Sequence, residues 1–116
     1  YQYQGEIARA EVNLTAAEEA RQQTQAIALG EISRARADLN AAIDKVRRYD
    51  EQMLAEAKTA ADAAEFAYQH GAMGVTDLLD ARRVYRTLQL DAANARADYA
   101  KSLAAWQAAT QPQEAP

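Results

Sequence analysis

Small and apolar residues recur along most of the chain at alternating steps of three and four positions, which is the spacing of a coiled-coil seam. The first half of the chain has a long seam of this kind, interrupted at Glu56: Ile32, Ala35, Leu39, Ala42, Val46, Tyr49, Met53, Ala60, Ala63 and Ala67. The second half has another, broken only at Ser102: Leu78, Ala81, Tyr85, Leu88, Ala92, Ala95, Tyr99 and Trp106. The pattern predicts two long helices that face each other.

The two seams are separated by a short stretch with two glycines, Gly71 and Gly74. A glycine after the last periodic residue predicts the end of a helix. Thr76 is then the predicted N-cap of the next helix, because its hydroxyl can accept a hydrogen bond from the free N–H groups of the first turn. Asp77 and Asp80 place negative charge at the positive end of that helix. The chain is therefore predicted to fold back on itself here.

These signals divide the chain into five parts. Residues 1–4 are expected to be the end of a strand or disordered. Residues 5–70 form one long helix and residues 71–75 form the turn. Residues 76–109 form the returning helix, and the proline-containing residues 110–116 form a disordered tail. The predicted fold class is all-α, a long antiparallel hairpin of the coiled-coil type with unequal arms.

The unequal arms have a consequence for packing. At 1.5 Å per residue the first helix is about 100 Å long and the second about 50 Å, so the second covers the first only as far as about residue 35. Near Gly30 the heptad spacing of the long helix is interrupted, because an extra step of four residues separates the seam before it from the seam that begins at Ile32. Such an interruption, a stutter, unwinds a supercoil locally. Before it lies a separate seam: Ile7, Ala10, Leu14, Ala17 and Ala28. The region from Gly5 to about Ser33 is therefore expected to need a partner outside this chain, or to fray.

Composition favours an extended shape. Hydrophobic residues make up 49% of the chain, but alanine alone supplies 30 of its 116 residues, and alanine buries little area. Small residues also lie off the two seams, as at Ala57, Ala61, Ala64 and Ala93, which suggests neighbours on more than one face. Acidic and basic residues are interspersed, with a net charge of −4, so a nucleic-acid surface is not expected. The chain begins at Tyr1, and we expect it to be a piece of a longer polypeptide.

The sequence offers little catalytic or metal-binding chemistry. There is no cysteine, and the single histidine, His70, has no second histidine within ligand spacing. No Ser, Thr or Tyr has a His or Lys arranged as an activating base. Asp77 and Asp80 lie one helical turn apart, but no cleft-forming architecture supports them as a hydrolase pair. We therefore expect no enzyme, no cofactor and no metal site.

Two segments resemble the TolC-type outer-membrane efflux channels. The first is Tyr68, Gly71 and the run Asp77-Leu78-Leu79-Asp80-Ala81, which is similar to the second helical-hairpin tip of that family. The second is Gln4-Gly5-Glu6-Ile7-Ala8-Arg9-Ala10, which is similar to the segment that enters the long descending helix. The separation of the two segments also matches. The resemblance is to the C-terminal half-repeat and is closest to the branch that exports heavy-metal cations.

The resemblance implies a fragment of a trimeric α-barrel in the outer membrane, with this segment in the periplasm. The chain would form the wall and periplasmic gate of a passive exit duct that exports metal cations or drugs. Implied partners are two further copies in a homotrimer, a periplasmic adaptor (membrane fusion protein) and an inner-membrane pump. Contact with the membrane would be made only through β-strands that this chain lacks.

The resemblance also implies roles for single residues. Asp77, Asp80 and Tyr68 match positions that line and close the periplasmic entrance, and rings of carboxylates attract cations. The family arginine two residues after the tip glycine is replaced here by Met73, so Arg82 or Arg83 would have to substitute in any salt-bridge lock.

The tip itself has a second implied role, which is docking to the hairpin tips of the adaptor. Small residues allow close approach of another backbone. The tip residues that match are Gly71, Ala72, Met73 and Gly74.

An alternative function is a stand-alone coiled-coil interaction hairpin, such as a scaffold or a periplasmic adaptor hairpin. An adaptor hairpin is expected to have arms of equal length and flanking β-rich domains, so the unequal arms favour the channel. The upstream reading frame would decide between the two, because a channel needs a preceding homologous half.

Overall fold

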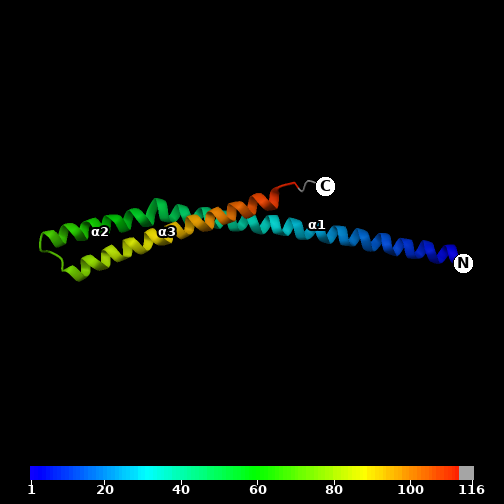
Figure 1. Ribbon diagram of the computed structural model, residues 1–116, viewed down its shortest axis with the longest axis horizontal. Coiled ribbons are helices and arrows are strands. Elements are labelled where there is room, and N and C mark those ends of the chain that lie inside the picture. Colours follow the sequence, from blue (N-terminus) through cyan, green and yellow to red (C-terminus); the bar gives the residue numbers. More distant parts are fainter. Residues whose placement is uncertain (113–116) are drawn as a thin grey trace.

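The computed structural model is an antiparallel helical hairpin with one arm about twice as long as the other (Figure 1). It describes residues 1–112. Helix α1 (Gln2–Arg48) continues through a π-helical turn, η1 (Tyr49–Met53), into helix α2 (Leu54–Gln69). After a tight turn, helix α3 (Val75–Thr110) runs back along α2 and the second half of α1. The molecule measures 102 × 25 × 18 Å, and the described residues contain no strand.

The predicted hairpin and its unequal arms are confirmed, with small differences at the ends. The expectation of a strand end or disorder at residues 1–4 is wrong for Gln2–Gln4, which are helical. The helix extends to this end because it can propagate without a break, and the Gly5 N–H donates to the Tyr1 carbonyl at 3.3 Å. Helix α3 includes Thr110, which was assigned to the tail. Gln111 is the C-cap of α3 and Pro112 lies outside the helix, and residues 113–116 of the predicted tail lie outside the described residues.

The buried part of the interface between the arms is thin and made mainly of alanine. Its buried residues are Ala57, Ala61 and Ala64 on α2, and Leu78, Ala92 and Ala95 on α3. Because alanine side chains are short, the two helix backbones can approach closely, but little apolar area is removed from water per residue. The predicted seam of α3 is confirmed throughout, since each of its residues is buried or half-buried. No polar or charged side chain is buried in the described part of the chain.

The predicted seam of the long arm is confirmed above η1, that is before Tyr49 in the chain. Below η1 it is wrong for Ala60 and Ala63, whereas Ala67 is half-buried as predicted. The residues from Ile32 to Tyr49 that were assigned to the seam are half-buried. Below η1, Ala60 and Ala63 are exposed, and the buried residues are Ala57, Ala61 and Ala64. The cause is the π-helical turn, in which the Leu54 N–H donates to the carbonyl of Tyr49, five residues earlier. One additional residue in a turn moves the whole seam by one position.

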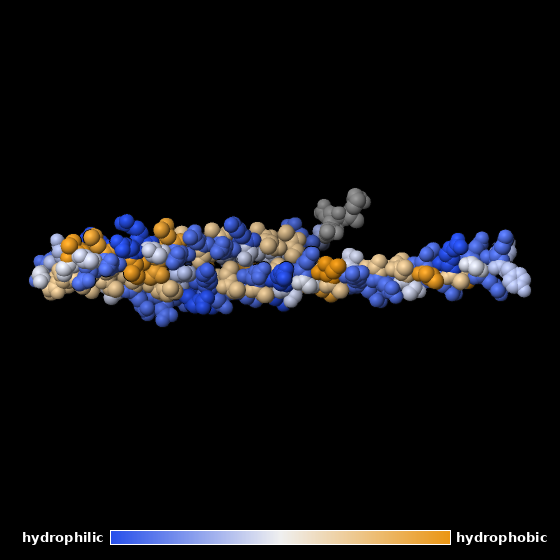
Figure 2. Space-filling model, turned by 90° about the horizontal axis from the view of Figure 1, so that it is seen from below, coloured by the Kyte–Doolittle hydropathy of each residue, from blue (hydrophilic) through white to orange (hydrophobic). Residues whose placement is uncertain are grey.

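About the first two thirds of α1 is exposed, and only its part from Thr24 to Glu31 borders the end of α3, in an open surface groove. Every residue from Tyr1 to Glu31 is exposed, and Ile32 is the first half-buried residue. Figure 2 shows this arm as a single helix extending beyond the paired region, with hydrophobic residues along it. The prediction that the returning helix covers only the lower part of the long arm is therefore confirmed. Helix α1 passes through Gly30 without interruption, so the stutter does not break the helix.

Candidate functional site at the hairpin tip

The first half of the tip is a glycine-terminated helix end. His70 is the C-cap of α2, and Gly71 follows with a φ of +74°, in the left-handed region. The Gly71 N–H donates to the carbonyl of Tyr68 at 3.0 Å, and the Ala72 N–H donates to that of Ala67 at 2.8 Å. These two bonds define a Schellman motif, which satisfies carbonyls that the end of a helix leaves free. The predicted helix end at Gly71 is confirmed.

The second half of the tip begins α3 earlier than predicted. The N-cap is Gly74, with extended backbone angles of −77° and 160°, and the Leu78 N–H donates to its carbonyl at 3.2 Å. The prediction of Thr76 as N-cap is wrong, because the extended conformation at Gly74 lets the chain enter the helix at Val75. Thr76 therefore lies inside the first turn. No side-chain cap is present at this end, and Asp77 supplies the negative charge of the first turn.

The two tip glycines should respond differently to substitution, although a Cβ at either would meet open space. Gly71→Ala should destabilise the hairpin by about 1 kcal/mol, because an L-residue is strained in the left-handed region. Gly74→Ala should cost less, roughly 0.5 kcal/mol, because its backbone angles suit any residue and only the preference of an N-cap for glycine over alanine is lost. Urea denaturation followed by circular dichroism measures both. Equal losses would contradict the role given to Gly71.

The structure brings the three predicted gate residues to the same end of the hairpin. Asp77 and Asp80 lie on the first two turns of α3 and are exposed, and Tyr68, on the last turn of α2, is 44% exposed. Within residues 1–112, no hydrogen bond or ion pair joins any two of them. The carboxylate of Asp80 pairs with Arg83 at 3.7 Å along the same helix. The tip thus presents two carboxylates and a phenol to solvent.

Both arginines that were considered as substitutes for the missing family arginine have partners in the structure. Arg82 forms an ion pair with Glu65 on the opposite arm, and Arg83 pairs with Asp80. The Arg82 and Glu65 side chains are 51% and 37% exposed, so the pair contributes at most about 1 kcal/mol to stability. Sequence analysis missed this pair. Its two residues are 17 positions apart, and only the register of one arm on the other brings them together.

His70 acts as part of the helix end. Its Nδ1 lies 2.8 Å from the Phe66 carbonyl, and its ring stacks on that of Phe66 with centroids 4.0 Å apart. The described residues contain no group of three or more His, Cys, Asp or Glu side chains placed to hold a metal ion. Within the same residues, no helix is apolar over a long enough stretch to cross a membrane.

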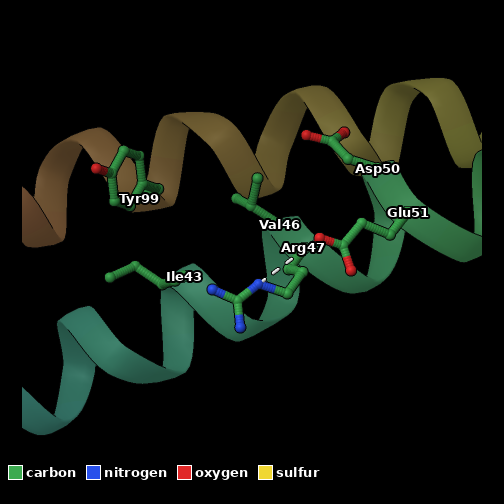
Figure 3. A pocket seen from close by; sticks show the side chains of 6 residues that line it. All are labelled: Ile43, Val46, Arg47, Asp50, Glu51 and Tyr99. Atoms are coloured by element: carbon green, nitrogen blue, oxygen red, sulfur yellow. Dashed lines mark ion pairs between the residues drawn. The ribbon is translucent and has the colours of Figure 1, made fainter.

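Away from the tip, an open groove lies beside η1 (Figure 3). Ile43 and Val46 from α1 and Tyr99 from α3 supply its apolar lining. Its charged residues are paired: Arg47 with Glu51 at 3.8 Å, and Asp50 with Arg96 of the other arm. The groove marks the place where the helix changes its periodicity.

No family model matches the sequence, and comparison with curated proteins and with solved structures finds no similar protein.

Proposed function

We propose that this chain is a wall and gate segment of an outer-membrane efflux channel. It would form part of a passive exit duct that lies in the periplasm and serves a tripartite pump for metal cations or drugs. The observation that carries the proposal is the uncovered arm of α1, from Gln2 to Glu31. Every residue of this arm is exposed and only its last two turns, from Thr24 to Glu31, border the end of α3, whereas a helix of a complete hairpin would be covered along its length.

The apolar residues of the uncovered arm favour neighbours on two sides. Five large side chains there are each more than half exposed: Ile7, Val12, Leu14, Ile27 and Leu29. At about 100° per residue, Ile7, Leu14 and Leu29 share one face of the helix. Val12 and Ile27 point elsewhere on the circumference. A helix in the wall of a closed barrel has a neighbour on each side, and this arrangement fits that position.

The paired region also has apolar residues that α3 and α2 leave in solvent. Phe66 on α2 is exposed, as are Leu79, Val84 and Leu90 on α3. A two-helix hairpin needs only one apolar stripe per helix, so these additional residues favour lateral packing against further copies. A homotrimer closed by such contacts is the assembly that we propose.

The tip then becomes the entrance of the duct. In a trimer, exposed Asp77 and Asp80 would form rings of carboxylates around the axis, which attract cations and repel anions. Tyr68 would take part in closing the entrance. The residues Gly71–Gly74 form a compact turn with little side-chain bulk, a surface on which an adaptor protein could dock closely.

The first test is conductance of the full-length protein in planar lipid bilayers. The double variant Asp77→Asn, Asp80→Asn should lower the ratio of cation to anion permeability several-fold, because it neutralises both carboxylates of each copy. Asp98→Asn is the matched control, since Asp98 is also an exposed aspartate of α3 but lies far from the tip. Asp98→Asn should leave the ratio unchanged. An unchanged ratio in the double variant would contradict the gate assignment.

A second test is the reading frame upstream of Tyr1. A channel of this type requires a preceding homologous half with its own aromatic, glycine and aspartate tip, together with membrane strands. An upstream frame without such a half would leave the interaction hairpin as the function.

A further inference from the structure

The turn η1 joins two segments that contact α3 in different phases. Above it, the contact residues of the long arm follow one heptad register as far as Tyr49. Below it, the contact residues are Ala57, Ala61 and Ala64, one position later than a continuous α-helix would place them. In a continuous helix the residues facing α3 would be Met53, Glu56, Ala60 and Ala63. The segment Leu54–Gln69, called the lower arm below, thus contains two alanine seams side by side, and η1 determines which of them contacts α3.

Glu56 explains which seam is used. In a continuous α-helix, the carboxylate of Glu56 would face α3 among alanines, and burying an unpaired charge costs several kcal/mol. The π-helical turn rotates the lower arm so that Glu56 is exposed and Ala57 takes the buried place. Beyond this position the two seams present side chains of equal size to α3, because Ala60 and Ala63 of one correspond to Ala61 and Ala64 of the other.

We propose that η1 is a register switch, in which the segment Leu54–Gln69 can occupy two registers on α3 and Glu56 sets the balance between them. In the second register η1 is α-helical. Each residue of the lower arm then takes the place now held by the residue after it. The segment rotates by about 100° and advances by about 1.5 Å towards the tip. This proposal does not rest on the proposed function.

The change of register has defined effects at the tip. Glu65 moves to the outer place of Phe66, so its ion pair with Arg82 breaks. Phe66, now 65% exposed, moves to the half-buried place of Ala67. Tyr68, now 44% exposed, moves to the exposed place of Gln69, one position further around the helix. The pair Glu65–Arg82 therefore stabilises the observed register, and the orientation of Tyr68 reports which register is occupied.

The test uses single cysteines, because the natural chain has none. Ala60→Cys and Ala61→Cys are made separately and alkylated with iodoacetamide, and each rate is divided by the rate of the same chain in urea. In the natural background the cysteine at position 60 should react at least about tenfold faster, since Ala61 is 8% exposed and Ala60 lies in solvent. Adding Glu56→Leu should reverse the order. Asp62→Leu, the matched control, should leave it unchanged, because position 62 belongs to neither seam.

A second variant keeps the test decisive if Glu56→Leu fails to fold. Deleting Gln52 removes the additional residue from η1, so that an uninterrupted α-helix brings the same alanines to α3. We expect the cysteine at position 61 to stay protected and the melting temperature to be unchanged or higher. Two results would overturn the proposal. One is a folded Glu56→Leu variant that retains the original order of rates, and the other is a Gln52 deletion that exposes position 61.

Discussion

Leu78→Ala is expected to destabilise the hairpin by about 2–3 kcal/mol, the typical cost of removing a buried leucine. Leu78 is the largest side chain among the buried residues and is only 3% exposed, on the first turn of α3. The buried residues of the opposite arm are alanines, whose short side chains cannot fill the cavity. The free energy of unfolding can be measured by urea denaturation with circular dichroism at 222 nm.

The neighbouring residue provides the control. Leu79 is the next residue of α3 and has the same side chain, but it is 49% exposed. Leu79→Ala should therefore change the free energy of unfolding by about 0.5 kcal/mol or less. If the two leucines gave equal losses, the face of α3 that packs on α2 would be assigned wrongly.

Ala92→Asp is expected to have a larger effect and to separate the arms. Ala92 is 1% exposed, in the middle of the paired part of α3. A carboxylate there would lie between two helices without a partner, at a cost of about 3–5 kcal/mol. Sedimentation velocity should show a more extended molecule, and the circular dichroism melt should lose its cooperative transition.

Ala93→Asp is the matched control for this change. Ala93 precedes Asn94 on the exposed side of α3, so the same substitution there places the charge in water. Helix propensity falls equally in both variants, by roughly 0.5 kcal/mol, and only burial differs between them. A variant Ala92→Asp as stable as Ala93→Asp would mean that the two arms do not pack through this face.

The features that the sequence predicted correctly depend on local signals. The φ of +74° at Gly71 is a conformation that glycine adopts readily, so the end of the first helix was visible in the residue itself. The seam of α3 contains large residues such as Tyr85 and Tyr99, and these fix its phase. The uncovered arm followed from counting residues on either side of the turn, because helix length is proportional to residue number.

The features that were missed depend on the contact between the two arms. Below Tyr49 the long arm is so rich in alanine that both phases match the heptad pattern, and only the interruption at Glu56 indicated a change. The register shift at η1 was therefore invisible in hydrophobic spacing alone. The cross-arm pairs Glu65–Arg82 and Asp50–Arg96 follow from that register and were missed with it. The error at Thr76 arose because Gly74 also suits an N-cap without offering a side chain.

For the candidate site, the sequence correctly grouped Tyr68, Asp77 and Asp80 at one end of the molecule. Their exposure is a property of the structure, and their roles in a pore stay predictions. These roles depend on neighbours that a single chain does not contain.

The uncovered arm of α1 also has a mechanical consequence. From Gln2 to Glu31 it is a helix about 45 Å long with no buried or half-buried residue. It can therefore tilt as one rigid rod about the region near Ile32, the first half-buried residue. A tilt of about 10° there would displace the far end by about 8 Å, given that length. A partner that covered this arm would therefore fix the direction of the whole rod with little force, because it would act far from the point about which the arm tilts.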